Sequence, residues 1–169
     1  MNGRPVGRPL EFTVPLSGFA VASGLRALHE VVLILDVADE FLDEILDGVR
    51  AACRKDFSVG VRLSPERFGM DLGEILVLAQ DLMTGGKVDY LDMSLWDVFK
   101  EPEDAAFKGK TLLQWFSSLP RGDCRLGAAG KIATGAQCQK AMDEGLDFVV
   151  IGRAAILHHD FPKKVAANA

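Results

Sequence analysis

The chain has 169 residues, of which 49% are hydrophobic and 25% are charged, a composition that suits one globular domain with an apolar core. Its net charge is -5 and no basic cluster occurs, so nucleic acid is not expected as a partner. The longest apolar run, residues 31–35, is too short to cross a bilayer, so no membrane span is expected. Three cysteines form no C-x-x-C motif, which favours a reducing cytoplasm over a disulfide framework: Cys53, Cys124 and Cys138.

The first 37 residues show no repeating strand and helix pattern. Within them, the apolar stretch 31–37 (VVLILDV) fits one strand or one helix equally well. Residues 38–53 carry apolar side chains at helical spacing and acidic side chains on the opposite face. This second stretch predicts an amphipathic helix, and the acidic residues on it are read as a solvated face and not as a metal site.

The middle of the chain alternates between strand and helix patterns. The stretch 58–63 (SVGVRL) predicts a strand, and residues 71–86 predict a helix that begins at an aspartate and ends at two glycines. A second strand is expected at 88–93 (VDYLDM). A charged connection over 97–110 then leads to a short helix at 111–118.

Two apolar runs near the C-terminus each end in glycine. The first covers residues 124–132 and the second covers residues 146–153. Between them, Thr134 and Gln137 form a capping-box pattern, and Gly145 supplies a helix stop. The segment therefore predicts a strand, a helix and a second strand, and a crossover of this length implies that the two strands are parallel.

The four predicted strands define the expected fold class. Repeats of roughly thirty residues with continuous apolar strands imply a parallel α/β sheet covered by helices. A doubly wound sheet would carry a G-x-G-x-x-G motif after its first strand, which is missing here, whereas a (β/α)8 barrel places a phosphate site after its last two strands. We therefore expect an N-terminal segment over 1–37 and a partial (β/α)8 TIM barrel over 38–169. The strands are expected to start at Val59, Val88, Arg125 and Phe148.

The ends of the last two strands form a candidate anion site. Parallel neighbours bring Gly130 and Gly152-Arg153 to one edge of the sheet, where glycine lets backbone N–H groups approach an anion. A helix that begins after Arg153 would add its positive dipole end. The alternative is that each glycine only ends a strand, which is the usual reading of an isolated glycine.

Five stretches, taken together, resemble the old yellow enzyme family of FMN-dependent NAD(P)H oxidoreductases. They occur in the family's order and at similar spacing over most of the chain: 59–65, 88–94, 128–132, 151–153 and 160–162. The resemblance implies that this is the C-terminal half only, with barrel strands five to eight in an open arrangement. Other FMN-dependent (β/α)8 oxidoreductases remain an alternative.

The resemblance also assigns cofactor-binding residues. It places Arg62 beside the pyrimidine edge of the flavin, where a cation stabilises negative charge during reduction. From the residues alone, the alternative is that Arg62 pairs with a carboxylate such as Asp92. The expected reaction is hydride transfer from NAD(P)H through the flavin to an activated alkene. The FMN phosphate would be held by Ala129, Gly130, Lys131, Gly152 and Arg153.

The catalytic residues are unassigned. The family's H-x-x-H/N motif does not occur; His29 stands alone, Tyr90 lies early in its strand, and the adjacent pair His158-His159 suits neither a carbonyl nor a metal. Four parallel strands do not close into a barrel, so we expect a homo-oligomer or a complementary half-barrel partner. A non-catalytic half-barrel that binds FMN weakly or not at all is therefore the second reading.

Overall fold

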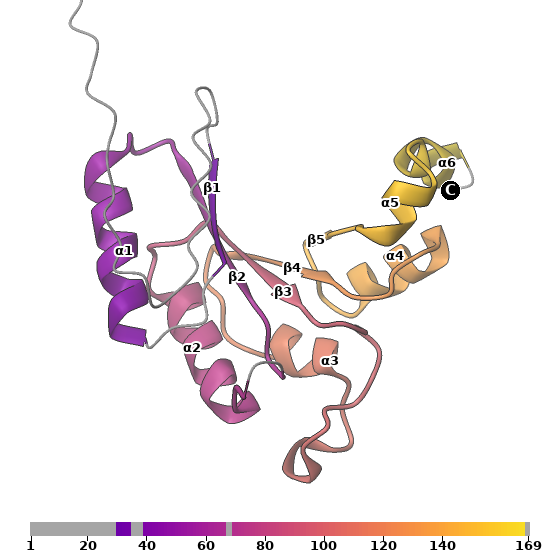
Figure 1. Cartoon of the computed structure of the whole chain (residues 1–169), viewed down its shortest axis with the longest axis horizontal. Coiled ribbons are helices and arrows are strands. Elements are labelled where there is room, and N and C mark those ends of the chain that lie inside the picture. Colours follow the sequence, from indigo (N-terminus) through magenta and orange to yellow (C-terminus); the bar gives the residue numbers. More distant parts are fainter. Residues whose placement is uncertain (1–29, 35–38, 67–68, 168–169) are drawn as a thin grey trace, which may run out of the picture.

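The computed structural model describes residues 30–34, 39–66 and 69–167, which form an α/β fold around one parallel sheet (Figure 1). The elements in chain order are β1 (Glu30–Ile34), α1 (Asp39–Ala52), β2 (Ser58–Leu63), α2 (Leu72–Thr84), β3 (Tyr90–Ser94), the 3-10 turn η1 (Ala105–Phe107), α3 (Leu112–Ser117), β4 (Arg125–Ala129), α4 (Gly135–Asp143), β5 (Phe148–Val149), α5 (Arg153–Leu157) and α6 (Phe161–Ala167).

The strands lie in the order in which they occur in the chain. The order is β1-β2-β3-β4-β5, and every neighbouring pair is parallel. Figure 1 shows helices α1, α2, α3 and α4 following one another beside the sheet in the same order as the strands. A doubly wound sheet reverses its strand order at a switch point, and the described strands contain no such reversal. The predicted parallel α/β sheet is therefore confirmed.

Polar side chains cap the starts of α2, α3 and α4. The side chain of Asp71 accepts a hydrogen bond from the Glu74 N–H at 3.0 Å, and the pair Thr111 and Gln114 forms a complete capping box at α3. At α4, Thr134 accepts from the Gln137 N–H at 3.2 Å, but the Gln137 side chain accepts from the N–H of Ala133. The capping box predicted there is thus formed in part, with its second bond shifted by one residue.

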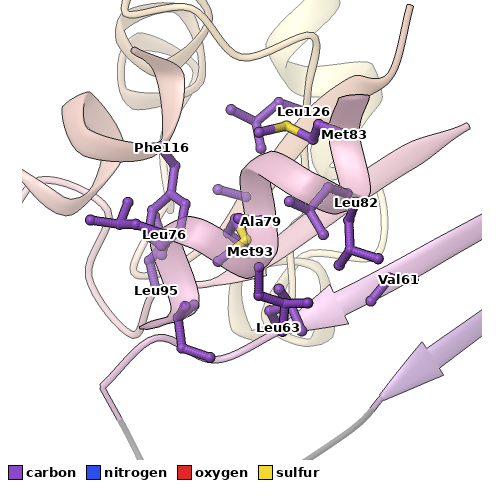
Figure 2. Packing of buried hydrophobic residues seen from close by; sticks show 14 of the residues in the cluster. Val61, Leu63, Leu76, Ala79, Leu82, Met83, Met93, Leu95, Phe116 and Leu126 are labelled. Carbon is purple, nitrogen blue, oxygen red and sulfur yellow. The ribbon is translucent and has the colours of Figure 1, made fainter. Parts of the chain in front are cut away.

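The hydrophobic core lies between the sheet and helices α2 and α3 (Figure 2). Alternate strand residues, such as Val61 and Met93, point to this side, where Ala79 of α2 and Phe116 of α3 meet them (Figure 2). Each of these four side chains is completely buried. Burial of a large apolar side chain stabilises a fold by about 1.5–3 kcal/mol, so this side of the sheet provides most of the cohesion of the domain.

The structure changes two details of the predicted elements. β1 lies in the stretch left open between strand and helix, and it pairs with β2 from Glu30 opposite Ser58. The sheet therefore begins before the boundary expected at residue 38; the remainder of 1–37 lies outside the described residues. β5 is limited to two residues, because the ladder ends after the Val150 N–H bonds the Ala128 carbonyl at 3.0 Å. No helix in the described part of the chain is long and apolar enough to span a membrane.

Candidate functional site

The side of the sheet opposite the core carries the residues that the sequence singled out. We call it the Arg62 face; its residues over β2 to β5 are Ser58, Gly60 and Arg62 of β2, Tyr90, Asp92 and Ser94 of β3, Arg125, Gly127 and Ala129 of β4, and Phe148 of β5. Strand register places these residues beside one another, because parallel neighbours in register point to the same side. Polar and glycine positions thus alternate along each strand with the apolar positions of the core.

Arg62 makes the ion pair that the sequence analysis kept as its alternative. Its Nη1 lies 2.9 Å from Oδ2 of Asp92, and its Nη2 donates to Oγ of Ser94 at 3.3 Å. The Asp92 side chain is 8% exposed, and its Oδ1 has no hydrogen-bond partner. Burial raises the pKa of Asp92, and the neighbouring Arg62 opposes that rise. Arg62 is therefore a fixed, partly neutralised cation near the C-terminal end of β2 on this face.

Two aromatic rings cover glycines on the Arg62 face. A Cβ added to Gly60 would lie 2.1 Å from the ring of Tyr90, and a Cβ added to Gly127 would lie 2.1 Å from the ring of Phe148. Both positions must therefore be glycine if the rings are to stay in place. The two rings lie nearer the N-terminal ends of the strands, whereas Arg62 and Ala129 lie further toward the C-terminal ends of theirs.

The turn after β4 is held by the loop that follows β3. Gly130 lies against that loop: an added Cβ would be 3.0 Å from the backbone of Trp96 and Asp97, and its carbonyl accepts from the Val98 N–H at 3.2 Å. Lys131 has a φ of 51°, and its Nζ lies 3.2 Å from Oδ2 of Asp97. Close packing is thus one reason for glycine at position 130, in addition to the approach of a ligand.

The turn after β5 is open by comparison. A Cβ added to Gly152 would meet nothing within 4 Å, and both Gly152 and Arg153 are exposed. The Arg153 guanidinium lies over the indole of Trp96, 5.7 Å from the ring centroid. The expected helix does begin at Arg153, but α5 has five residues, too few to supply a useful dipole.

Backbone donors remain at both turns. Among the described residues, the N–H groups of Gly130, Lys131 and Gly152 have no hydrogen-bond acceptor. The two turns follow neighbouring strands, because Ala128 pairs with Val149. Unpaired N–H groups with a lysine and an arginine at one sheet edge can bind a phosphate or another oxyanion. Histidine, cysteine and acidic residues, in contrast, form no cluster of three that could hold a metal within the described ranges.

Sequence reasoning missed the loop after β3. Residues 97–110 were read as a charged connection, yet Trp96 and Asp97 contact both candidate cations. Within the described ranges, Trp96 and Lys131 are the non-glycine residues with positive φ, a conformation that costs such residues about 1–2 kcal/mol. An isolated tryptophan carries no sequence signal for either property, so this contribution could not be found without the structure.

Comparisons with known proteins identify no family for this chain. No protein-family model and no curated protein matches the chain. Among solved structures, the chain is similar to the enoyl reductase domain of MlnA from the macrolactin biosynthesis cluster of Bacillus amyloliquefaciens, with 14% sequence identity and a TM-score of 0.32. The similarity covers 68% of this chain and 45% of that chain, so this chain spans less than half of the protein it matches. At this TM-score the similarity assigns neither a function nor a cofactor.

Proposed function

We propose that this chain is the C-terminal half of an FMN-dependent NAD(P)H oxidoreductase of the old yellow enzyme type. The observation that carries the proposal is the pair of cation-bearing glycine turns, Gly130-Lys131 and Gly152-Arg153, at the C-terminal ends of neighbouring parallel strands. The family resemblance expects the FMN phosphate at this place. The free N–H groups of these turns support an oxyanion ligand there.

The sheet topology supports the proposal that the chain forms part of a barrel. Five parallel strands run in sequential order, and helices α2 and α3 pack on the side of the sheet away from the Arg62 face. A (β/α)8 barrel has this order and keeps its helices outside, so the Arg62 face would be the barrel interior. β1 to β5 would then be barrel strands four to eight, one more strand than the sequence indicated.

The residues present fit FMN at two points. Gly130, Lys131, Gly152 and Arg153 offer backbone donors and two cations to the phosphate, and Arg62 offers a fixed cation to the pyrimidine edge. When bound, FMN would accept a hydride from NAD(P)H and deliver it to an activated alkene. This chain would bind and orient the cofactor, with Arg62 stabilising negative charge. The ion pair of Arg62 with Asp92 would keep the guanidinium in the plane of the face.

A visible absorption spectrum tests the proposal. The purified chain is incubated with FMN and separated from unbound FMN by gel filtration, and its visible absorption spectrum is then recorded. Riboflavin, treated in the same way, is the matched control. Flavin that stays with the protein after FMN treatment, and less after riboflavin treatment, supports the phosphate site. Equilibrium dialysis sets the limit: a protein that retains no FMN above the buffer level at about 1 mM FMN contradicts the proposal, because that affinity corresponds to only about 4 kcal/mol of binding free energy.

A second function is favoured by what the Arg62 face contains. Over β2 to β5, this face carries two arginines, one aspartate, two serines and two aromatic residues, but no histidine that could bind a substrate carbonyl. A non-catalytic half-barrel that binds FMN, alone or with a complementary half, would have this composition. NAD(P)H oxidation in the presence of an enone separates the two functions. Turnover by the isolated chain supports the complete oxidoreductase, and bound FMN without turnover supports the binding half.

A further inference from the structure

We propose that Trp96 is a positioning residue for Arg153, and that its indole face holds the guanidinium ready for a phosphate monoester. The inference rests on the proposed function, because the phosphate is that of the bound FMN. It adds a third element to the site: the loop after β3, which neither the motif pattern nor the family resemblance had assigned.

The backbone around Trp96 is anchored to the end of β4. The Leu95 N–H donates to the Ala129 carbonyl at 2.8 Å, and the Val98 N–H donates to the Gly130 carbonyl at 3.2 Å. Trp96 lies between these two bonds with a φ of 50°, a conformation that persists only where the surroundings enforce it. Its backbone is thus tied to the same glycine turn that would meet the ligand.

The contact with Arg153 leaves the guanidinium donors available. A cation–π contact draws the guanidinium to the ring face and, unlike a carboxylate, takes up none of its N–H groups as an acceptor. A carboxylate partner would occupy those donors, and among the described residues Arg153 has no such partner. Three half-buried arginines differ, because each is paired with an aspartate: Arg50 with Asp89, Arg62 with Asp92, and Arg121 with Asp147.

The loop after β3 makes different contacts with the two cations, Lys131 and Arg153. Asp97 pairs with Lys131 at 3.2 Å, which reduces the charge that Lys131 offers to an anion. Trp96, the residue before it, orients Arg153 without neutralising it. The strongest free cation of the site is thus on the β5 side. A phosphate monoester fits this arrangement better than a carboxylate, because its two negative charges and three terminal oxygens can meet the Arg153 guanidinium and the backbone N–H groups of the turns at the same time.

Equilibrium dialysis of FMN and riboflavin tests the inference through their affinity ratio. We expect Trp96→Leu to weaken FMN binding about three- to tenfold with riboflavin unchanged, as the loss of a cation–π contact and of guanidinium orientation predicts. Trp96→Phe keeps an aromatic face and should restore most of the affinity. Trp115→Phe is the matched control, because Trp115 lies in α3 against Phe107 and should leave both affinities unchanged.

A second measurement does not depend on altering Trp96. The chain has two tryptophans, so Trp115→Phe leaves Trp96 as the sole indole fluorophore. Titration with inorganic phosphate should then give a saturable change in Trp96 emission, and Arg153→Lys, which keeps the charge but not the planar fork that binds two phosphate oxygens, should weaken it. Sodium chloride at equal ionic strength controls for screening.

The outcomes distinguish the role of Trp96 from the proposed binding of the FMN phosphate. If the unaltered chain binds FMN no better than riboflavin, the phosphate site itself is wrong and the inference falls with it. If the unaltered chain prefers FMN and Trp96→Leu keeps the full preference, or if Trp96 emission ignores phosphate, the inference alone is overturned.

Discussion

The ring of Tyr90 meets the ring of Phe148 edge to face, with centroids 5.7 Å apart and planes at 82°. Each ring covers a glycine of the strand before it, Gly60 for Tyr90 and Gly127 for Phe148. The four strands are consecutive in the sheet, in the order β2-β3-β4-β5. The same local arrangement thus occurs twice, and the two copies meet at their aromatic rings.

The repeat extends to the residue before each ring. Oδ2 of Asp89 accepts from the Val59 N–H at 2.7 Å and from Arg50 at 2.9 Å. Oδ2 of Asp147 accepts from the Leu126 N–H at 2.8 Å and from Arg121 at 3.0 Å. An aspartate and an aromatic residue at a strand start therefore lock onto the preceding strand, which sets the register of both pairs. The strand pairs β2-β3 and β4-β5 therefore share the same set of contacts between an aspartate, an aromatic ring and the preceding strand.

The glycines beneath the rings should resist substitution. Gly60→Ala should destabilise the fold by about 1–3 kcal/mol, because its Cβ would overlap the Tyr90 ring and force the ring to move. Gly48→Ala is the control: nothing lies within 4 Å of its Cβ in α1, and alanine should stabilise that helix by about 0.5–1 kcal/mol. Urea denaturation measures both. Pairing Gly60→Ala with Tyr90→Ala should reduce the cost of the glycine change; an unchanged cost would exclude the ring overlap as its cause.

Asp89 should stabilise the protein at neutral pH and lose that effect in acid. Burial pushes its pKa upward, but the bonds from Val59 and Arg50 outweigh burial and hold the pKa below its usual 3.8. A carboxyl with a lowered pKa contributes stability above 3.8, and this contribution disappears as the pH falls through the lowered value.

Asp89→Asn should therefore cost about 1 kcal/mol at pH 7, a modest value because the side chain is nearly half exposed, and progressively less below pH 3.8. Asp56→Asn, in an exposed pair with Arg54, should change stability little at any pH and serves as control. A difference from the unaltered chain that grows as the pH falls would contradict this account.

Asp92 should behave in the opposite direction. Burial raises its pKa above 3.8, with Arg62 opposing, so the folded chain holds more protons than the unfolded chain between 3.8 and the raised value. Stability contributed by Asp92 should fall as the pH rises through that interval. Measured as unfolding free energy of the unaltered chain minus that of Asp92→Asn, the difference should decrease from pH 4 to pH 7. A difference that increases over this range would mean that the Arg62 pair dominates over burial.

Cys124 should be the least reactive of the cysteines whose surroundings are described. Burial, followed by the nearby carboxylates of Asp89 and Asp147, raises its pKa to about 11, so little thiolate exists at pH 8. Cys53 and Cys138 are half-buried. Alkylation with iodoacetamide followed by peptide mass mapping should label Cys53 and Cys138 before Cys124, and in urea the order should vanish. Early labelling of Cys124 in the folded chain would contradict its burial.

The elements were predictable wherever local chemistry decides them. Asp71 caps α2 and Thr111 begins α3 with a full capping box, because these bonds involve residues three apart. Register and long-range packing were not predictable in the same way. Arg62 faces Asp92 because β2 and β3 pair in a particular register, and both partners lie 30 residues apart in the chain.

In the candidate site, too, the features set by local sequence were predictable and those set by long-range contacts were not. Glycine followed by a cation after an apolar run identified the turns at Gly130 and Gly152, since both signals are local. The positive φ of Trp96 has no such signal, because its conformation is imposed by hydrogen bonds to β4. β1 was ambiguous because its apolar run of a few residues, without clear turn residues around it, suits either a strand or a helix.

The affinity of the chain for FMN relative to riboflavin is the decisive measurement for a phosphate site at the Gly130 and Gly152 turns, because the two ligands differ only in the phosphate. We expect the unaltered chain to bind FMN at least about tenfold more tightly than riboflavin, a gap of about 1.4 kcal/mol that charge-assisted bonds to one phosphate readily supply. We also expect Arg153→Ala to remove most of this gap without changing the thermal stability, because Arg153 is exposed. Equal affinities for FMN and riboflavin in the unaltered chain would contradict the phosphate site.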